Sequence, residues 1–141
     1  MEARETEHLF KVFRARPGDE AGLLDGRGTT ARAVVEPGRV LRVVERTVAG
    51  IPAERLHLCC AVPKKAKLDQ LLKQAAELGV WSIRPVRCRR SVAEGGSRER
   101  WDLLLREACK QSGNPFLPRI LPEEPLPDAL ERLQKEKIRL Y

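Results

Sequence analysis

Residues 55–80 read RLHLCCAVPKKAKLDQLLKQAAELGV, and this stretch indicates the fold class of the C-terminal part. Its opening, residues 55–62, is a nearly continuous apolar run, which is typical of a strand buried on both faces. Apolar side chains then recur at helical spacing, at Leu68, Leu71, Leu72, Ala75 and Ala76. Gly79 stands where a glycine commonly ends a helix. The stretch therefore predicts a buried strand followed by an amphipathic helix.

The same alternation continues toward the C-terminus. We expect a strand over residues 80–86, followed by a helix that Ser97 caps and that stops at Gly113. A proline-containing extended connection follows over 114–127. After it we expect a helix over 128–135 and the start of a strand over 138–141. The apolar stripe of the helix after Ser97 consists of Trp101, Leu104, Leu105 and Ala108. Strands that alternate with helices predict a parallel sheet with covering helices.

The N-terminal part has a different pattern, that of small antiparallel strands. Three strands are expected, over residues 20–25, 29–36 and 40–47, after a short helix over 8–14. The turn signal Glu36-Pro37-Gly38 joins the last two strands into a hairpin. Strands this short favour a compact barrel over a layered sheet. We therefore predict an α+β chain of two domains, residues 1–52 and residues 53–141.

The balance of charge favours a polyanionic partner. The chain has 27 Lys and Arg against 20 Asp and Glu, a formal net charge of +7. This balance favours nucleic acid as the partner, although a charge-rich solvated surface would look the same. No apolar run is long enough for a membrane helix and no signal peptide is visible, so we expect a cytoplasmic protein without membrane contact. Four cysteines without a CxxC spacing and only two histidines argue against a metal site.

Basic residues cluster in and directly after the predicted strands of the C-terminal part. The first cluster is Lys64, Lys65 and Lys67, and the second is Arg84, Arg87, Arg89 and Arg90. Ligands of open α/β sheets gather at the carboxyl ends of the strands, so we expect these side chains to contact phosphate. The alternative is a solvated loop. In the N-terminal part, Arg14 is a further RNA-binding candidate, or else a surface arginine that caps a short helix.

Three blocks of sequence are similar to the RsmE family, bacterial enzymes that methylate N3 of a uridine in 16S ribosomal RNA. The blocks are HLFKVFRARPGD at 8–19 with LDGRG at 24–28, PKKAKLDQLLKQAAELGV at 63–80 with IRP at 83–85 and RS at 90–91, and EACKQSG at 107–113 with LP at 117–118. Their order and spacing together make the resemblance specific. Asn114 departs from it, because the family usually has Arg at this position.

The resemblance implies a PUA-like β-barrel that binds RNA, followed by an α/β SPOUT domain with a trefoil knot that binds S-adenosylmethionine. It also implies a homodimer that acts on the 16S rRNA of the small ribosomal subunit. The family's glycine-rich GPEGG segment and its later LRxETA segment hold the cofactor, and neither occurs in this sequence. We therefore expect a partial version of the enzyme, which alone neither binds cofactor nor turns over substrate. The alternative is a non-enzymatic RNA- or ribosome-binding module.

The chemistry that the resemblance implies requires the removal of a proton from N3 of uracil, because the protonated nitrogen is a poor nucleophile. The RNA-binding candidates are Arg14, Lys64, Lys65, Lys67, Arg89 and Arg90, and the candidates for an active-site pocket are Glu77, Arg90, Ser91, Gln111 and Ser112. Glu77 is included because a carboxylate near the C-terminal end of a helix opposes the helix dipole, and a specific partner would offset this. The alternative is an ordinary surface glutamate, which is common in helices. For Gln111 and Ser112, hydrogen bonding at a helix end is an equal alternative. No residue is assigned a catalytic role.

Overall fold

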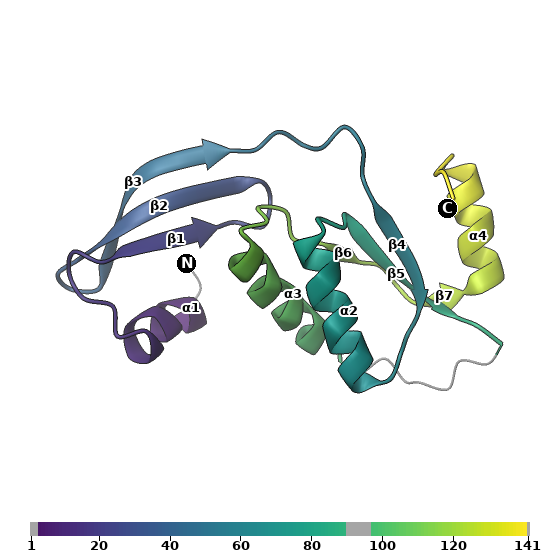
Figure 1. Ribbon diagram of the computed structural model, residues 1–141, viewed down its shortest axis with the longest axis horizontal. Helices are drawn as coiled ribbons and strands as arrows, with labels where there is room; N and C mark the ends of the chain where they lie inside the picture. The colour runs from purple at the N-terminus through teal and green to yellow at the C-terminus, as the bar shows by residue number, and fades with distance from the viewer. Residues whose placement is uncertain (1–2, 90–96, 141) are drawn as a thin grey trace. The chain divides into compact units, whose positions relative to one another are not determined.

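The computed structural model describes residues 3–89 and 97–140 (Figure 1). The chain divides into two compact units, Met1–Ile51 and Pro52–Tyr141. Each unit contains a sheet of its own, antiparallel in the first and parallel in the second. Among the described residues, no helix has the length and apolar character needed to cross a membrane.

The first unit is a sheet of three antiparallel strands, β1 (Glu20–Leu24), β2 (Thr29–Glu36) and β3 (Val40–Val48), in that order. Strands β2 and β3 form the predicted hairpin. The turn between β1 and β2 is closed by Asp25, whose carboxylate accepts the backbone N–H groups of Arg27 at 2.7 Å and Thr29 at 2.9 Å. These bonds hold the pKa of Asp25 below its usual value. A short helix α1 (Ala3–Glu7) and a π-helical turn η1 (His8–Val12) precede the sheet.

This sheet has one polar and one apolar face. On the polar face, Arg32 of β2 pairs with Glu20 of β1 at 2.8 Å and with Glu45 of β3 at 3.3 Å, so one side chain links all three strands. On the other face, Ala33 and Val35 are buried. Strands β1 and β3 remain open edges among the described residues, so these strands do not close the expected barrel. Three strands are too few to curl into a cylinder.

The second unit is built on a parallel sheet, as the predicted alternation of strands and helices indicates. Strands β4 (His57–Ala61), β5 (Ser82–Arg87) and β6 (Arg119–Ile120) lie side by side in this order, and β7 (Glu124–Pro125) pairs with the end of β5. Helices α2 (Lys65–Glu77) and α3 (Arg98–Ser112) pack together on one side of the sheet, and α4 (Leu126–Lys135) lies on the other (Figure 1).

The hydrophobic core of the second unit lies between α2, α3 and the sheet. Its largest fully buried side chains are Leu72, Ile83 and Leu105, one from each of these three elements. Ala76 and Ala108 belong to the same cluster and are also buried. Small residues at such positions let the two helix backbones approach each other closely. The apolar stripes of both helices, which the sequence predicts, therefore face this core.

The helix ends follow the expected capping chemistry. Beyond α2, Gly79 adopts the left-handed conformation, with φ of 72°, and the N–H of Val80 donates to the carbonyl of Ala75 at 2.9 Å. This is the Schellman arrangement, which favours glycine because a β-carbon is strained at this φ. Helix α3 begins at Ser97, whose hydroxyl accepts the N–H of a first-turn residue, and ends at Gly113, with φ of 71°.

Three expectations needed correction or refinement, all because of pairing between strands. Strand β4, expected to be buried on both faces, is half-buried because among the described residues it is an edge strand that pairs with β5 alone. The expected extended connection over 114–127 contains two short strands, β6 and β7, which pair with β5. Residues 138–140 form no strand, since no described strand lies beside them, and Tyr141 is outside the described residues.

Candidate functional site

Four exposed basic residues lie at or shortly after the ends of strands β4 and β5, at one edge of the sheet. The two strands are parallel, with Ala61 opposite Val86, so the segments that follow them leave the sheet at the same edge. The exposed basic residues there are Lys64, Lys67, Arg87 and Arg89, which we call the basic edge. Exposed ammonium and guanidinium groups in such a place suit contacts with phosphate.

The charges of the basic edge are mostly available to a ligand. Within the described part of the chain, Lys64, Lys67 and Arg89 make no ion pair. Arg87 lies 3.5 Å from the carboxylate of Glu123, but both side chains are exposed, and pairs of this kind contribute little to stability. Two further sequence candidates, Arg90 and Ser91, are outside the described residues, as is the side chain of Lys65.

Arg84 has a different role from the neighbouring arginines. Only 12% of its side chain is exposed, and its guanidinium donates to Glu124 of β7 and lies 3.8 Å from the carboxylate of Glu136. Arg132 of α4 also reaches Glu124, at 3.2 Å. The hydrogen bond from Arg84, with help from Arg132, holds the pKa of Glu124 below its usual value. The structure therefore places Arg84 in an internal network that fastens α4 and β7 to β5, apart from the basic edge.

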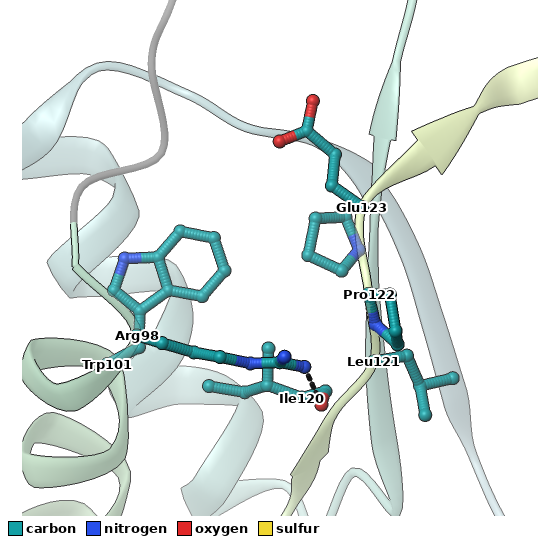
Figure 2. Close-up of a pocket in the computed structure, with 7 residues that line it drawn as sticks. Arg98, Trp101, Ile120, Leu121, Pro122 and Glu123 are labelled. Atoms are coloured by element: carbon teal, nitrogen blue, oxygen red, sulfur yellow. Dashed lines mark hydrogen bonds between the residues drawn. The ribbon is translucent and has the colours of Figure 1, made fainter.

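A small pocket of about 190 Å³ lies between α3 and the segment after β6. Figure 2 shows the indole of Trp101 on the helix side and Pro122 and Glu123 on the strand side. The side chain of Arg98 crosses the pocket floor, and its guanidinium donates to the backbone carbonyl of Ile120 at 2.6 Å (Figure 2). Because Glu123 also pairs with Arg87, the pocket adjoins the basic edge. This site could not be predicted from the sequence, since residues 98 and 123 come to line one pocket only through the pairing of β6 and β7 with β5.

Three candidate pocket residues lie at the opposite edge of the sheet. Glu77 and Ser112 are the last residues of α2 and α3, and Gln111 directly precedes Ser112. The two helices run in the same direction, because Asp69 and Arg100 pair at 2.5 Å near their starts and Asn114 reaches the end of α2. All three candidates are exposed.

Glu77, Gln111 and Ser112 therefore share the amino edge of the sheet, away from Lys64 and Lys67. The hydroxyl of Ser112 donates to the carbonyl of Ala108 at 2.8 Å, which is the helix-end hydrogen bond that the sequence left as an alternative.

Arg14 lies in the first unit, directly after the helical turn η1. Its side chain is exposed and its φ is 53°, in the left-handed region that few residues other than glycine adopt. An exposed guanidinium at this place is compatible with a phosphate contact, and the structure assigns it no partner among the described residues.

Three of the four cysteines are poorly suited to nucleophilic chemistry. Burial raises the pKa of Cys60 and of Cys109 to about 11, and burial also raises the pKa of Cys59. Thiols with such pKa values stay protonated near neutral pH and are weak nucleophiles. Among residues 3–89 and 97–140, no group of three or more His, Cys, Asp or Glu side chains has the proximity needed to hold a metal ion.

Comparison with known proteins identifies relatives for both units. A family model described as an RNA methyltransferase domain matches residues 51–141, and one described as an RNA methyltransferase PUA domain matches residues 2–43. Ribosomal RNA small subunit methyltransferase E of Bacillus subtilis is 24% identical over 141 residues, covering 92% of this chain and 55% of that protein. The Mycobacterium bovis protein of the same name is 29% identical over 139 residues, covering 92% and 53%.

Solved structures of such proteins have the same fold. The ribosomal RNA small subunit methyltransferase E of Neisseria gonorrhoeae, bound to S-adenosyl methionine, has a TM-score of 0.81 and 25% identity over 94% of this chain and 58% of that chain. A probable rRNA-methyltransferase from Porphyromonas gingivalis has a TM-score of 0.78 and 24% identity over 92% and 57%. The chain spans about half the length of the curated relatives that it matches.

Along the chain, the PUA match falls on the unit with the antiparallel sheet, and the RNA methyltransferase match falls on the parallel α/β unit. The domain matches and the relatives are all RNA methyltransferases, as the resemblance of the three sequence blocks implies. The chain belongs to the RsmE family of RNA methyltransferases, with a PUA domain followed by an RNA methyltransferase domain.

Proposed function

We propose that this chain is the RNA-binding portion, and the first part of the methyltransferase domain, of a cytoplasmic homodimeric enzyme that methylates N3 of a uridine in 16S rRNA. The basic edge carries the proposal, because it presents exposed cationic groups where parallel α/β sheets bind their ligands. Three of them, Lys64, Lys67 and Arg89, make no ion pair within the described residues. The membership of both units in an RNA methyltransferase family makes RNA phosphate the expected ligand.

In this proposal the chain's own residues position the RNA. Lys64, Lys67, Arg87 and Arg89 bind backbone phosphates, which fix the register of the strand without reading its sequence. The target base must be single-stranded or flipped out, since N3 of a paired uracil is not accessible. The proposed reaction needs no covalent bond to a cysteine, because the deprotonated base nitrogen is itself the nucleophile.

The pocket at Trp101 by itself does not fit S-adenosylmethionine, the methyl donor that the family implies. The pocket at Trp101 encloses about 190 Å³, whereas sites for ligands of that size usually enclose about 300–1,000 Å³. Its charged groups are also engaged, because Arg98 donates to a backbone carbonyl and Glu123 pairs with Arg87. We therefore expect the 141-residue chain to bind RNA without transferring a methyl group.

RNA binding is tested with a fluorescently labelled 16S rRNA fragment at a series of KCl concentrations. We expect Lys64→Ala and Lys67→Ala each to weaken binding and to reduce the slope of log K against log salt by about 0.7–1. Lys73→Ala is the matched control, because Lys73 is exposed in the middle of the same helix. An equal loss of affinity in Lys73→Ala would show that general charge, rather than the basic edge, binds the RNA.

The expected lack of turnover is tested separately. The purified chain is incubated with small-subunit rRNA and S-adenosylmethionine, and N3-methyluridine is measured by mass spectrometry after nuclease digestion. We expect none above background. Formation of N3-methyluridine by this chain would overturn the proposal that it is a partial enzyme, and would leave the proposed RNA-binding role of the basic edge untouched.

A further inference from the structure

A second group of cationic and aromatic side chains lies at the amino edge of the parallel sheet. The guanidinium carbon of Arg55 is 4.9 Å from the ring centroid of Trp81, and that of Arg119 is 5.9 Å from the same centroid. The ring centroid of Phe116 lies 5.5 Å from that of Trp81, and the two ring planes are inclined by 49°. We call these four residues the Trp81 cluster. It brings together three segments that are distant in sequence.

Backbone hydrogen bonds hold this cluster in place. The N–H of Trp81 donates to the carbonyl of Leu56 at 2.7 Å, and the N–H of Arg119 donates to the carbonyl of Trp81 at 3.0 Å. The backbone segments that carry the two arginines and the indole are therefore held beside one another before any ligand arrives. A surface that is ordered in advance loses less conformational entropy on binding.

The charges of the cluster are not neutralised by the protein. Arg55 and Arg119 are exposed and, within the described part of the chain, neither makes an ion pair. The arginines that have clear structural roles differ in this respect, since Arg84 and Arg32 each contact two carboxylates. Trp81 and Phe116 are half-buried, so part of the aromatic surface is open to solvent.

We propose that the Trp81 cluster is a second RNA-binding surface, which takes a single-stranded segment. Unstacked bases pack on the open aromatic surface and on the guanidinium planes, while phosphates contact Arg55 and Arg119. A duplex is not suited to this surface, because its base faces are already stacked on one another. This inference rests on the proposed function, because it takes from that proposal that the ligand is RNA.

The second surface is spatially separate from the basic edge. Strand β5, Ser82–Arg87, has six residues and separates Trp81 from the segment that carries Arg89, and at about 3.3 Å per residue it spans roughly 20 Å. One RNA molecule that contacts both edges would therefore extend along the sheet, and each surface contributes separately to affinity.

The test uses the whole chain with a fluorescently labelled 12-nucleotide oligouridylate, and a 12-base-pair RNA duplex for comparison. Trp101 is only 7% exposed, so quenching of tryptophan fluorescence by the oligonucleotide reports on Trp81. We expect quenching in the wild-type chain, binding about tenfold weaker in Trp81→Leu, and a salt slope smaller by about 0.7 in Arg119→Ala. Arg119→Lys keeps the charge, so it should keep the slope while losing affinity, and Lys73→Ala should behave as wild type.

Several results would overturn the inference. The first is saturation of the chain with oligouridylate without quenching of its tryptophan fluorescence. The second is wild-type affinity for oligouridylate in both Arg55→Ala and Arg119→Ala. The third is tighter binding of the duplex than of oligouridylate. If Trp81→Leu loses its native circular dichroism, the two arginine variants decide, because both positions are exposed. Loss of affinity in Lys67→Ala but not in these variants would leave the proposed function intact. Absence of all RNA binding by the wild-type chain would end both proposals.

Discussion

Replacing Asn114 by alanine is expected to destabilise the second unit substantially, although Asn114 lies outside any helix or strand. Its side-chain amide donates to the carbonyl of Ala76 at the end of α2 at 2.8 Å, and its side-chain oxygen accepts the N–H of Phe116 at 3.0 Å. Each such bond contributes about 0.5–1.5 kcal/mol. We expect Asn114→Ala to lower the free energy of unfolding by about 2 kcal/mol, because it removes two bonds to backbone groups, one of buried Ala76 and one of half-buried Phe116.

The measurement is urea and thermal unfolding followed by far-ultraviolet circular dichroism. A loss of this size corresponds to a fall in Tm of roughly 10 °C for a unit of under 100 residues. Gln111→Ala is the control, since Gln111 is exposed one turn earlier and such substitutions usually change stability by less than about 0.5 kcal/mol. Asn114→Asp keeps the acceptor but directs a carboxylate at the carbonyl of Ala76, so it should be destabilising at pH 7. If Asn114→Ala unfolds within 0.5 kcal/mol of wild type, the reasoning is refuted.

Three further predictions concern the turn, the ion pairs and the thiols. Gly79→Ala should cost about 1 kcal/mol, because φ is 72° there although a β-carbon would meet no neighbour, whereas Gly22→Ala, in open space at an ordinary φ, should be nearly neutral in the same unfolding assay. The pKa of Glu124 is lowered in the folded state, so its contribution to stability is present above the unfolded pKa and is lost as pH falls through the folded pKa. Glu124→Gln should therefore have a flatter profile of stability against pH below about pH 5, and an unchanged acid slope would contradict this. Cys60 and Cys109, with pKa values of about 11, should react with a thiol reagent at pH 7.5 much more slowly in the folded chain than in urea.

Local chemistry made much of the fold predictable. The helical spacing of Leu68, Leu72 and Ala76 and the capping residues Ser97 and Gly113 act over a few residues, so their effect can be read from neighbouring positions. The same holds for the hairpin of the first unit, whose turn residues and flanking β-branched residues are contiguous. The resemblance to the RsmE family rests on blocks of this kind.

Long-range pairing determined the features that the sequence did not reveal. Strands β6 and β7 have two residues each, and their proline-containing segment has no periodicity that could identify them. They exist because β5 offers backbone partners to residues 37 or 38 positions later in the chain. The pocket at Trp101 and the Trp81 cluster both depend on this pairing, so neither could be predicted from spacing along the chain.

The candidate site illustrates how strand geometry separates residues that are close in sequence. Arg84 and Arg87 both belong to β5 and are three positions apart, so their side chains project from opposite faces of the strand. Alternation along the strand was therefore a signal that the two arginines would have different surroundings. Arg84 is covered by α4 and β7 and is bonded to Glu124, whereas Arg87 is exposed at the strand end. It follows that the phosphate-binding role proposed for this edge depends on residues at and beyond the strand ends, and that Arg84→Ala should impair folding rather than RNA affinity in the folded fraction.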